Sequence, residues 1–358
     1  MILVDAHQDI AYNAVCFGRD YRQSALRKRQ LETSTDIPAQ AGIATLGLPE
    51  AIAGRVAVVF VTLFVAPRSP RPAPWKTVMY DDISGAYRLA LQQMDTYQRL
   101  ADDSGQIRLI RSQVDLDSVL ATWGDDKTVK DRQQGLVILM ENADPIIEPR
   151  QFEEWYERGV RIVGPAWQAS RYSAGTGAPG PLTPLGRELL EVMANFNAIL
   201  DLSHMAEIAF LEALDRYTGT VIASHSNPRH FCDTDRHLTD VMIRRLAERD
   251  GVMGIVMLNN FLDGKWSKTD PKNGVTFSRV VDIIDHVCQL TGSAAHVGLG
   301  SDFDGGFGAE STPAEIDTTA DLWYLGKALR QRGYNEDDIT AILGGNMLRK
   351  LRESLPTR

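Results

Sequence analysis

Residues 240–257 read DVMIRRLAERDGVMGIVM, an amphipathic stretch of helical length that closes on Gly251 and leads into an apolar run. The same alternation continues at RVVDIIDHVCQLTG (279–292) and HVGLGSD (296–302). Near-continuous apolar runs that alternate with helical segments predict βα units, whose parallel strands form a sheet buried on both faces. This part of the sequence therefore predicts an α/β fold.

Seven further β-rich runs accompany VMGIVM (252–257). They are ILVDA (2–6), VAVVFVTLFVA (56–66), GLVILME (135–141), VRIVGPA (160–166), AILDLS (198–203), TVIASH (220–225) and HVGLGSD (296–302). A weaker ninth run, IRLIRS (107–112), is interpreted as an accessory strand or the lead-in to a helix. Eight βα units predict one (β/α)8 TIM-type barrel over residues 1–358. A doubly wound open sheet is the alternative, but no GxGxxG directly follows any run.

The residues beyond eight ordinary units fall mainly at about 17–55 and 67–134, which we interpret as insertions into the barrel. The second insertion opens with the proline-rich segment APRSPRPAPW (66–75). No second core follows this segment, so we interpret it as an ordered surface loop or lid and not as a linker between domains.

The composition is that of an ordinary globular protein, with 44% hydrophobic and 24% charged residues among 358. A net charge of −9 without a basic stripe argues against nucleic-acid and anionic-membrane partners. The sequence shows neither the layout of a signal peptide nor an apolar run long enough to span a bilayer. The three cysteines are widely spaced and form no disulfide framework or CxxC site. We therefore expect a reduced, cytoplasmic enzyme.

Titratable side chains recur where the predicted strands end, which is where a barrel of this kind carries its chemistry. They are His7, Asp9, Glu141, His204, His225 and Asp302, with Asp304 close behind. His7 and Asp9 are two residues apart, so in an extended segment their side chains point the same way. One strand-end residue alone is more often a hydrogen-bonded loop residue, and Glu141 alone would be expected to pair with an arginine. The whole set predicts a metal site.

Three histidines and two carboxylates exceed what one tetrahedral zinc ion needs while it keeps a position open for water. The set suits two ions that share a carboxylate and a hydroxide, as in two-metal hydrolytic centres. Glu141 is the natural bridge, because a carboxylate has two oxygens and an imidazole offers one free lone pair.

The same residues lie in motifs that resemble the membrane (renal) dipeptidase family of zinc peptidases, peptidase family M19, over nearly the whole chain. The motifs are VDAHQD (4–9), MENAD (140–144), LTPLGRELLEVMANFNAILDLSH (182–204), VIASHSN (221–227), DRHLTD (235–240), VGLGSDFDGG (297–306) and GGNMLRKL (344–351). The resemblance implies a (β/α)8 barrel, two zinc ions per chain, a small dipeptide substrate and a homodimer.

The resemblance also implies individual roles. His7 and Asp9 match the pair that holds one zinc ion, and Glu141 matches the bridging carboxylate. The other zinc ion is held by the pair that His204 and His225 match. Arg236 matches the arginine that receives the terminal carboxylate of the substrate, and Asp302 matches the acid that handles protons beside the metals. The implied reaction is attack of a metal-bridging hydroxide on the peptide carbonyl.

The chain departs from the family pattern at Trp167, in VGPAWQAS (163–170), where family members carry a histidine. An indole N–H donates one hydrogen bond but carries no proton or positive charge, so Trp167 either walls the substrate pocket or serves a different substrate. His237, where the family has asparagine, is expected at the surface or behind the ligands. Asp304 is a candidate partner for the free amine of the substrate.

Other functions remain open at this point. The first alternative is a related amidohydrolase that acts on N-acyl amino acids, lactams or another small amide. The second is a catalytically silent barrel, and the third is a metal lyase that polarises a carbonyl without hydrolysis. Histidine and carboxylate sites also bind Mn, Co or Fe, so the residues do not distinguish among these metals and zinc.

Overall fold

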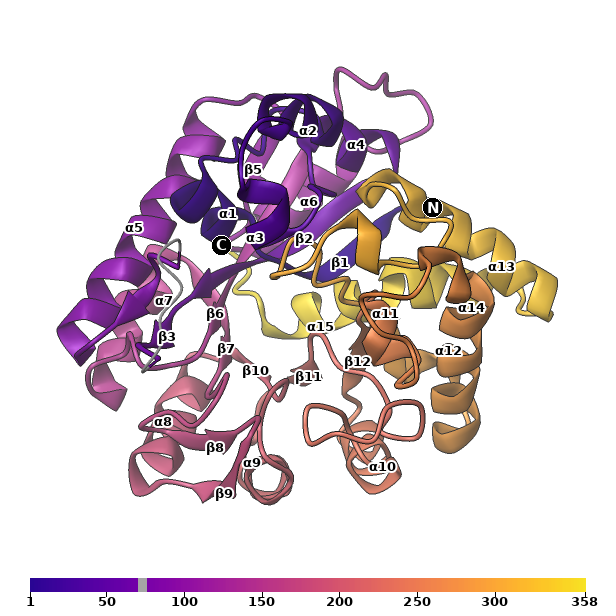
Figure 1. Ribbon diagram of the computed structural model, residues 1–358. Coiled ribbons are helices and arrows are strands. Elements are labelled where there is room, and N and C mark those ends of the chain that lie inside the picture. The colour runs from indigo at the N-terminus through magenta and orange to yellow at the C-terminus, as the bar shows by residue number, and fades with distance from the viewer. Residues whose placement is uncertain (70–75) are drawn as a thin grey trace.

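The computed structural model describes residues 1–69 and 76–358. Eight parallel strands form a closed barrel (Figure 1). The order around the ring is β1 (Leu3–Gln8), β2 (Val56–Phe64), β6 (Gln134–Glu141), β7 (Val160–Gly164), β10 (Ile199–Asp201), β11 (Val221–Ala223), β12 (Val252–Ile255) and β13 (Val297–Leu299). β2 pairs with both β1 and β6, and β1 pairs with β13, so the ring has no open edge. The predicted TIM-type barrel is confirmed.

Helices cover the outside of the strands (Figure 1). They are α1 (Ile10–Phe17), α5 (Ile83–Asp102), α7 (Phe152–Arg158), α8 (Pro184–Asn195), α9 (Glu207–Arg216), α10 (Asp240–Glu248) and α12 (Phe277–Thr291). α10 begins where the Thr239 side chain accepts a hydrogen bond from the Met242 amide, and it buries Met242, Ile243 and Leu246 on one face. Within residues 1–69 and 76–358, no helix combines the length and apolar character that a bilayer crossing requires.

The chain between β1 and β2 adds α2 (Ala25–Glu32), α3 (Ile37–Ala41) and α4 (Leu48–Ala53). Between β2 and β6 it adds β3 (Ala66–Pro67), β4 (Met79–Tyr80), β5 (Ile107–Leu109) and α6 (Gln113–Ala121) around α5. β5 pairs in parallel with the start of β6, which confirms an accessory strand over the first part of the run at 107–112; the rest of the run leads to α6. Most of the proline-rich segment that was predicted as a lid, residues 70–75, lies outside the described residues.

Several strands are shorter than the apolar runs that predicted them, because the chain leaves the ladder early at the carboxyl end. β10 ends at Asp201, whose carboxylate accepts hydrogen bonds from the amides of Ser203 and Ser224. The Asp201 side chain thus accepts hydrogen bonds from backbone amides that would pair with a neighbouring strand if the ladder continued. The hairpin of β8 (Ser173–Gly175) and β9 (Ala178–Leu182) follows the carboxyl end of β7.

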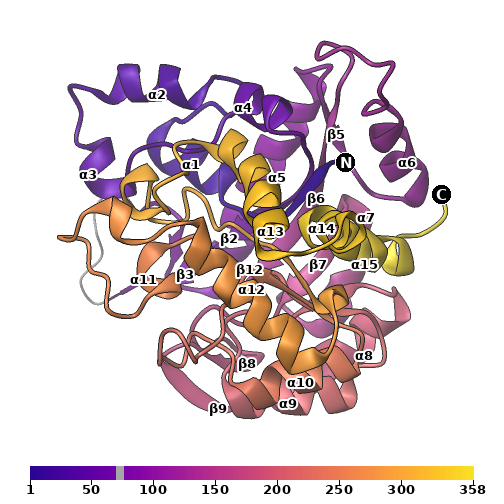
Figure 2. The same cartoon turned by 90° about the vertical axis from the view of Figure 1, so that its right-hand side faces the viewer.

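The two ends of the barrel differ. α13 (Leu325–Arg332) and α14 (Glu336–Thr340) lead through a π-helical turn to α15 (Asn346–Ser354). The Asn346 amide donates to the carbonyls of Ala294 and Val297, so α15 closes the amino ends of the strands. In Figure 2, α15 lies at the right, and β3 and α11 (Asn259–Leu262) lie at the left, beyond the carboxyl ends. The carboxyl end is therefore free to form a site.

Candidate metal centre and substrate cavity

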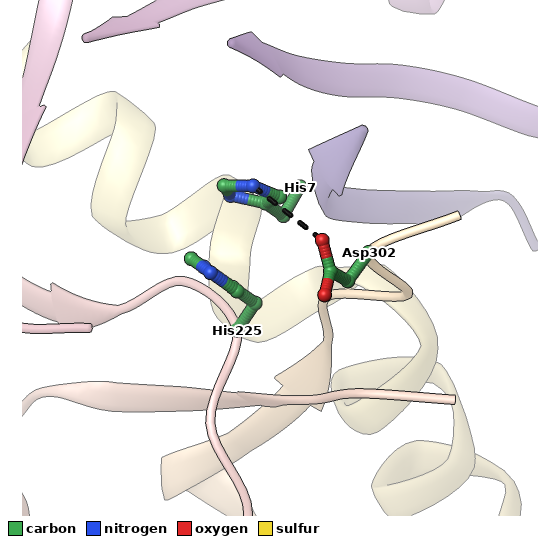
Figure 3. Close-up of side chains that lie close together, drawn as sticks. All are labelled: His7, His225 and Asp302. Atoms are coloured by element: carbon green, nitrogen blue, oxygen red, sulfur yellow. Dashed lines mark ion pairs between the residues drawn. The ribbon is translucent and has the colours of Figure 1, made fainter. Parts of the chain in front are cut away.

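Six titratable side chains meet at the carboxyl end of the barrel, and we call them the mouth cluster. Its members are His7, Asp9, Glu141, His204, His225 and Asp302. They come from β1, the end of β6 and the segments that follow β1, β10, β11 and β13, so the structure brings together every predicted metal ligand. Figure 3 shows the rings of His7 and His225 side by side, with the Asp302 carboxylate directed toward His7.

Glu141 lies between two groups of ligand atoms. Its Oε1 is 3.2 Å from Nε2 of His204 and 3.5 Å from Nε2 of His225. Its Oε2 is 3.5 Å from Nε2 of His7, which lies 3.8 Å from Oδ2 of Asp9. The two oxygens of one carboxylate thus face two different sets of ligands, the arrangement expected of a bridge.

The spacing of these atoms fits metal coordination. Ligand atoms around one tetrahedral ion with bonds of about 2.1 Å lie roughly 3.4 Å apart. Nε2 of His204 and Nε2 of His225 are 3.0 Å apart, and both lie close to Glu141 as given above. His7 and Asp302 form a further group with His225, at 3.8 Å from the His7 nitrogen to the Asp302 oxygen (Figure 3). The residues therefore fit divalent cations.

Nε2 of His7 supplies an independent sign of a missing partner. The atom is buried, and within the described residues no group forms a hydrogen bond with it. Buried polar atoms in folded proteins nearly always have a partner, so an exception calls for an explanation. A cation beside the carboxylates of Glu141 and Asp9 explains it.

Hydroxyl groups orient the ligands from behind. Oγ1 of Thr176 is 3.0 Å from Nδ1 of His204, and Oγ of Ser224 is 2.8 Å from Nδ1 of His225. Both rings therefore direct Nε2 toward the mouth cluster. Oγ1 of Thr62 donates to Oδ1 of Asp9 at 2.7 Å, while Oδ2 of Asp9 faces His7. Such outer contacts fix the orientation of metal ligands and tune their basicity.

Two buried acids inside the strands accept hydrogen bonds from serines near the ligands, and the sequence interpretation missed these acids. Asp201 accepts from the Ser224 hydroxyl at 2.5 Å, and Asp5 accepts from the amide and the hydroxyl of Ser301 at 2.7 and 2.6 Å. The signal was present, since ILVDA and AILDLS each carry one aspartate within an apolar run. An acid buried at such a place needs several donors.

Close backbone approach also positions His225. A Cβ atom added at Gly254 or Gly300 would lie 2.0 or 1.9 Å from the carbonyl oxygen of Ser224. Only glycine at these two positions, one on β12 and one directly after β13, leaves room for the Ser224 carbonyl.

Four residues at the mouth adopt left-handed backbone conformations that side chains disfavour. Their φ angles are 74° at Asn142, 65° at His204, 60° at Asp302 and 59° at Asp304. Two of these residues belong to the mouth cluster, and the other two are within two residues of it. Such strain persists only where the surroundings enforce it, and it collects at functional sites.

Charge at the mouth is unbalanced toward the negative. Burial and the charge of Glu141 raise the pKa of Asp9 to about 6, against the opposing effect of His7. Burial, together with Asp9 and Glu141, also raises the pKa of Asp302 well above its usual range. Burial works to lower the pKa of His7, but Glu141 and the two aspartates outweigh it and raise the pKa to about 10. The surplus of buried carboxylates attracts positive charge.

Above the mouth cluster lies a cavity of about 680 Å³. Asp9, Glu141, His204 and Asp302 contribute to its floor, and the predicted substrate residues Arg236 and Trp167 line it as well. Sequence interpretation missed other lining residues, among them Tyr12, Phe64, Gln168, Thr176 and Phe261.

Arg236 is 6% exposed and projects from the segment after β11. Its guanidinium donates to the His225 carbonyl at 2.8 Å and lies 5.7 Å from the centre of the Phe261 ring. Burial lowers its pKa, while the charges of Asp302 and Glu141 oppose that effect. A fixed cation at the edge of the cavity is suited to a carboxylate.

The structure bears on two weaker expectations. Asp304 is 1% exposed and accepts hydrogen bonds from the amide and the hydroxyl of Thr45 at 2.8 and 2.6 Å, so its carboxylate is engaged away from any substrate amine. His237 is fully buried, so of its two expected positions the surface is excluded and the one behind the ligands is not; its ring packs edge-on against Phe261 with 4.6 Å between ring centres. In both cases the chain folds back after the strand end, which spacing along the sequence does not reveal.

Comparison with known proteins now places the chain. The family model of the membrane dipeptidases, peptidase family M19, matches residues 1–356. The chain belongs to this family. It is a metal-dependent hydrolase with the family's barrel fold, as the sequence motifs predicted.

The chain is also similar to individual proteins and to a solved structure. An uncharacterised Klebsiella pneumoniae protein from the pqqA 5′ region is 32% identical over 71% of this chain and 92% of its own length. An uncharacterised dipeptidase of Schizosaccharomyces pombe is 30% identical over 56% of this chain, which spans 48% of that longer protein. A metallopeptidase from Rhodobacter sphaeroides, crystallised with a phosphinate mimic of the dipeptide L-Ala-D-Ala, shares the fold with a TM-score of 0.77 at 22% identity, over 99% of both chains.

Proposed function

We propose that the protein is a dipeptidase that uses two zinc ions, one held by His7 and Asp9 and the other by His204 and His225, with Glu141 between them. The observation that carries the proposal is the position of Glu141, whose two oxygens face two different ligand groups. Bound zinc supplies an acidified water and polarises the peptide carbonyl.

Asp302 is the proposed proton carrier. It lines the cavity, and its side chain keeps 15% of its surface exposed. Burial and the neighbouring carboxylates raise its pKa, which is the direction required of a carboxyl group that takes a proton from the attacking water and passes it to the leaving amine. Its left-handed backbone directs the carboxylate toward His7.

Arg236 sets the register of the substrate. A guanidinium can bind a terminal carboxylate through two parallel hydrogen bonds. Because Arg236 shares the cavity with the mouth cluster, a short substrate anchored there presents its peptide carbonyl near the cluster. This geometry favours dipeptides over long peptides.

The related amidohydrolase function is the second candidate, and Trp167 is the residue that favours it. It stands where family dipeptidases carry a histidine, and it offers no second charge for a peptide. An N-acyl amino acid has the same terminal carboxylate for Arg236 and lacks the free amine of a dipeptide.

The test is a hydrolysis screen with the full-length protein. The protein is stripped of metal with a chelator, reloaded with zinc and assayed against L,L-dipeptides, L,D-dipeptides and N-acetyl amino acids. The proposal predicts zinc-dependent cleavage of dipeptides and about two zinc ions per chain by elemental analysis. Cleavage restricted to N-acetyl amino acids would support the amidohydrolase, and a stoichiometry of one ion would contradict the bridging role of Glu141.

A further inference from the structure

The substrate cavity has two unlike sides. In the ring of eight strands, β2 lies opposite β11, four places away in either direction (Figure 1). Arg236 follows β11, and Phe261 follows β12. Phe64, at the end of β2, lies on the facing side together with Tyr12 on the adjacent α1, and Trp167 follows β7, which lies midway between β2 and β11. We call these three residues the aromatic wall.

The rings of the aromatic wall touch in sequence. Tyr12 and Phe64 meet edge to face with 5.8 Å between ring centres, and Phe64 meets Trp167 in the same way at 5.1 Å. Trp167 continues toward the mouth cluster, with its ring centre 6.2 Å from that of His204. The wall is therefore a continuous surface that begins beside the ligands.

Apolar side chains and one cation lie near the aromatic wall. Ala66, Val78 and Met79 also line the cavity, from the segments around β3 and β4. Lys76 lines it as well, so a cationic substrate group would meet a like charge. Aromatic rings and a thioether accept another aromatic ring in edge-to-face or offset contact.

We propose that the aromatic wall is the subsite for the amino-terminal side chain of the substrate, and that the preferred substrates are dipeptides with an aromatic first residue. The proposal rests on the proposed function, because Arg236 must hold the carboxyl end and the mouth cluster the peptide carbonyl. With those two points placed, the first side chain extends away from Arg236, toward the wall. Trp167, the departure from the family pattern, then acts as a specificity residue.

The experiment compares four L,L-dipeptides with the zinc-loaded protein: Phe-Ala, Ala-Ala, Ala-Phe and Lys-Ala. The proposal predicts that kcat/KM for Phe-Ala exceeds that for Ala-Ala by at least about 10-fold, since apolar pockets discriminate by this amount or more. Ala-Phe should lie near Ala-Ala, and Lys-Ala should lie at or below it. Equal values for Phe-Ala and Ala-Ala, or a preference for Lys-Ala, would overturn the proposal.

Variants locate the preference in the wall. Trp167→Ala should lower the ratio of Phe-Ala to Ala-Ala at least about fivefold, whereas Trp167→Phe should keep most of it because a ring contact is retained. Tyr324→Ala is the matched control, because Tyr324 is a largely exposed aromatic side chain that does not line the cavity. An unchanged ratio in Trp167→Ala would overturn the role of Trp167.

A binding measurement separates recognition from turnover. Calorimetry with phosphinate mimics of Phe-Ala and Ala-Ala should show tighter binding of the former by about the same factor, and Trp167→Ala should remove the difference. Failure to cleave any dipeptide while N-acetyl amino acids are cleaved would overturn the proposed function and with it this subsite. Cleavage of all dipeptides without an aromatic preference would overturn the subsite alone.

Discussion

Two groups of buried charges lie near the first strand, and they differ in how their charges are balanced. The mouth cluster holds three carboxylates and an imidazole nitrogen that has no hydrogen-bond partner within the described residues. The second group, which we call the insertion cluster, consists of Arg19, Lys28, Glu32 and Asp304. It contains two cations and two carboxylates, all at most 5% exposed.

Contacts within the insertion cluster are nearly complete. Arg19 binds both oxygens of Glu32, at 2.8 and 2.9 Å, and also donates to the Gly42 carbonyl at 2.6 Å. Lys28 donates to the Leu46 carbonyl at 2.7 Å. A buried ion pair whose donors and acceptors are hydrogen-bonded in this way needs no bound ion to balance its charge. The difference indicates that the insertion cluster is structural, whereas the mouth cluster is built to take up cations.

Asn13 joins the two clusters. Its Nδ2 donates to the backbone carbonyls of Asp9 and Asp304, at 2.9 and 2.8 Å, and its Oδ1 accepts from Arg19 at 3.0 Å. The insertion between β1 and β2 thus supports the loop that carries Asp9. The contrast between the two clusters can be tested by substituting one side chain in each.

The largest effect is expected for Glu141→Ala. Loss of the carboxylate between the two ligand groups should lower kcat/KM by more than the roughly 10–100-fold that removal of an outer partner of a metal ligand costs. Activity assays and elemental analysis of bound metal measure this. His204→Ala should behave alike, and the exposed Glu153→Ala provides a matched control with native activity. Native-like turnover in the Glu141 variant would contradict the metal assignment.

Glu32→Ala tests the insertion cluster. The change leaves the Arg19 guanidinium buried without its carboxylate, which should lower the free energy of unfolding by about 3–5 kcal/mol. Urea denaturation measures the loss. The double variant Arg19→Met/Glu32→Leu should lose less than the single variant, because it removes both partners of the Arg19–Glu32 pair and leaves neither buried without the other. A loss below about 1 kcal/mol in Glu32→Ala would show that the pair is not structural.

Arg236→Ala removes the cation at the edge of the mouth cluster. Hydrogen bonds to charged groups contribute about 1.5–3 kcal/mol, so KM for dipeptides should rise about 10- to 100-fold, with a smaller change in kcat. Steady-state kinetics with matched dipeptide amides form the control, because these substrates lack the carboxylate and should respond little. An equal effect on both substrate types would refute the anchoring role.

The smallest effect concerns pH and Lys28. Burial lowers the pKa of Lys28 to about 8, against an opposing effect of Asp304, and an unfolded lysine titrates near 10.4. Below pH 8 both states are protonated, whereas between pH 8 and about 10 the folded state releases its proton first. The unfolding free energy of the wild type, relative to Lys28→Met, should therefore rise by about 1–2 kcal/mol from pH 7.5 to 9.5. Denaturation at both pH values measures it, and a constant difference would contradict the shift.

Sequence patterns predicted the barrel and all six members of the mouth cluster, because both follow from the position of each residue relative to its own strand. Apolar runs mark strands, and strand ends in a parallel barrel meet at one rim, so His7, Glu141 and His225 could be placed together without knowing any contact. Family motifs then added Arg236. None of these inferences required a distance between residues far apart in the sequence.

The contacts that the sequence did not reveal depend on how loops fold back. Asp304 and Asp302 are two residues apart, yet one binds Thr45 and the other faces His7, because both have left-handed backbones that redirect the chain. Likewise, Tyr12 and Phe64 occur in apolar stretches that look like core. Only the ring order of the strands places them around a cavity.

The glycines at 254 and 300 set a limit on laboratory evolution of this protein. Any other residue there would place a Cβ atom within about 2 Å of the Ser224 carbonyl, directly before His225. In a mutant library that randomises the strands, most variants with a substitution at either glycine will therefore fail to fold correctly. Better positions to randomise are Trp167, Met79 and Gln168, which line the cavity from loops and short strands.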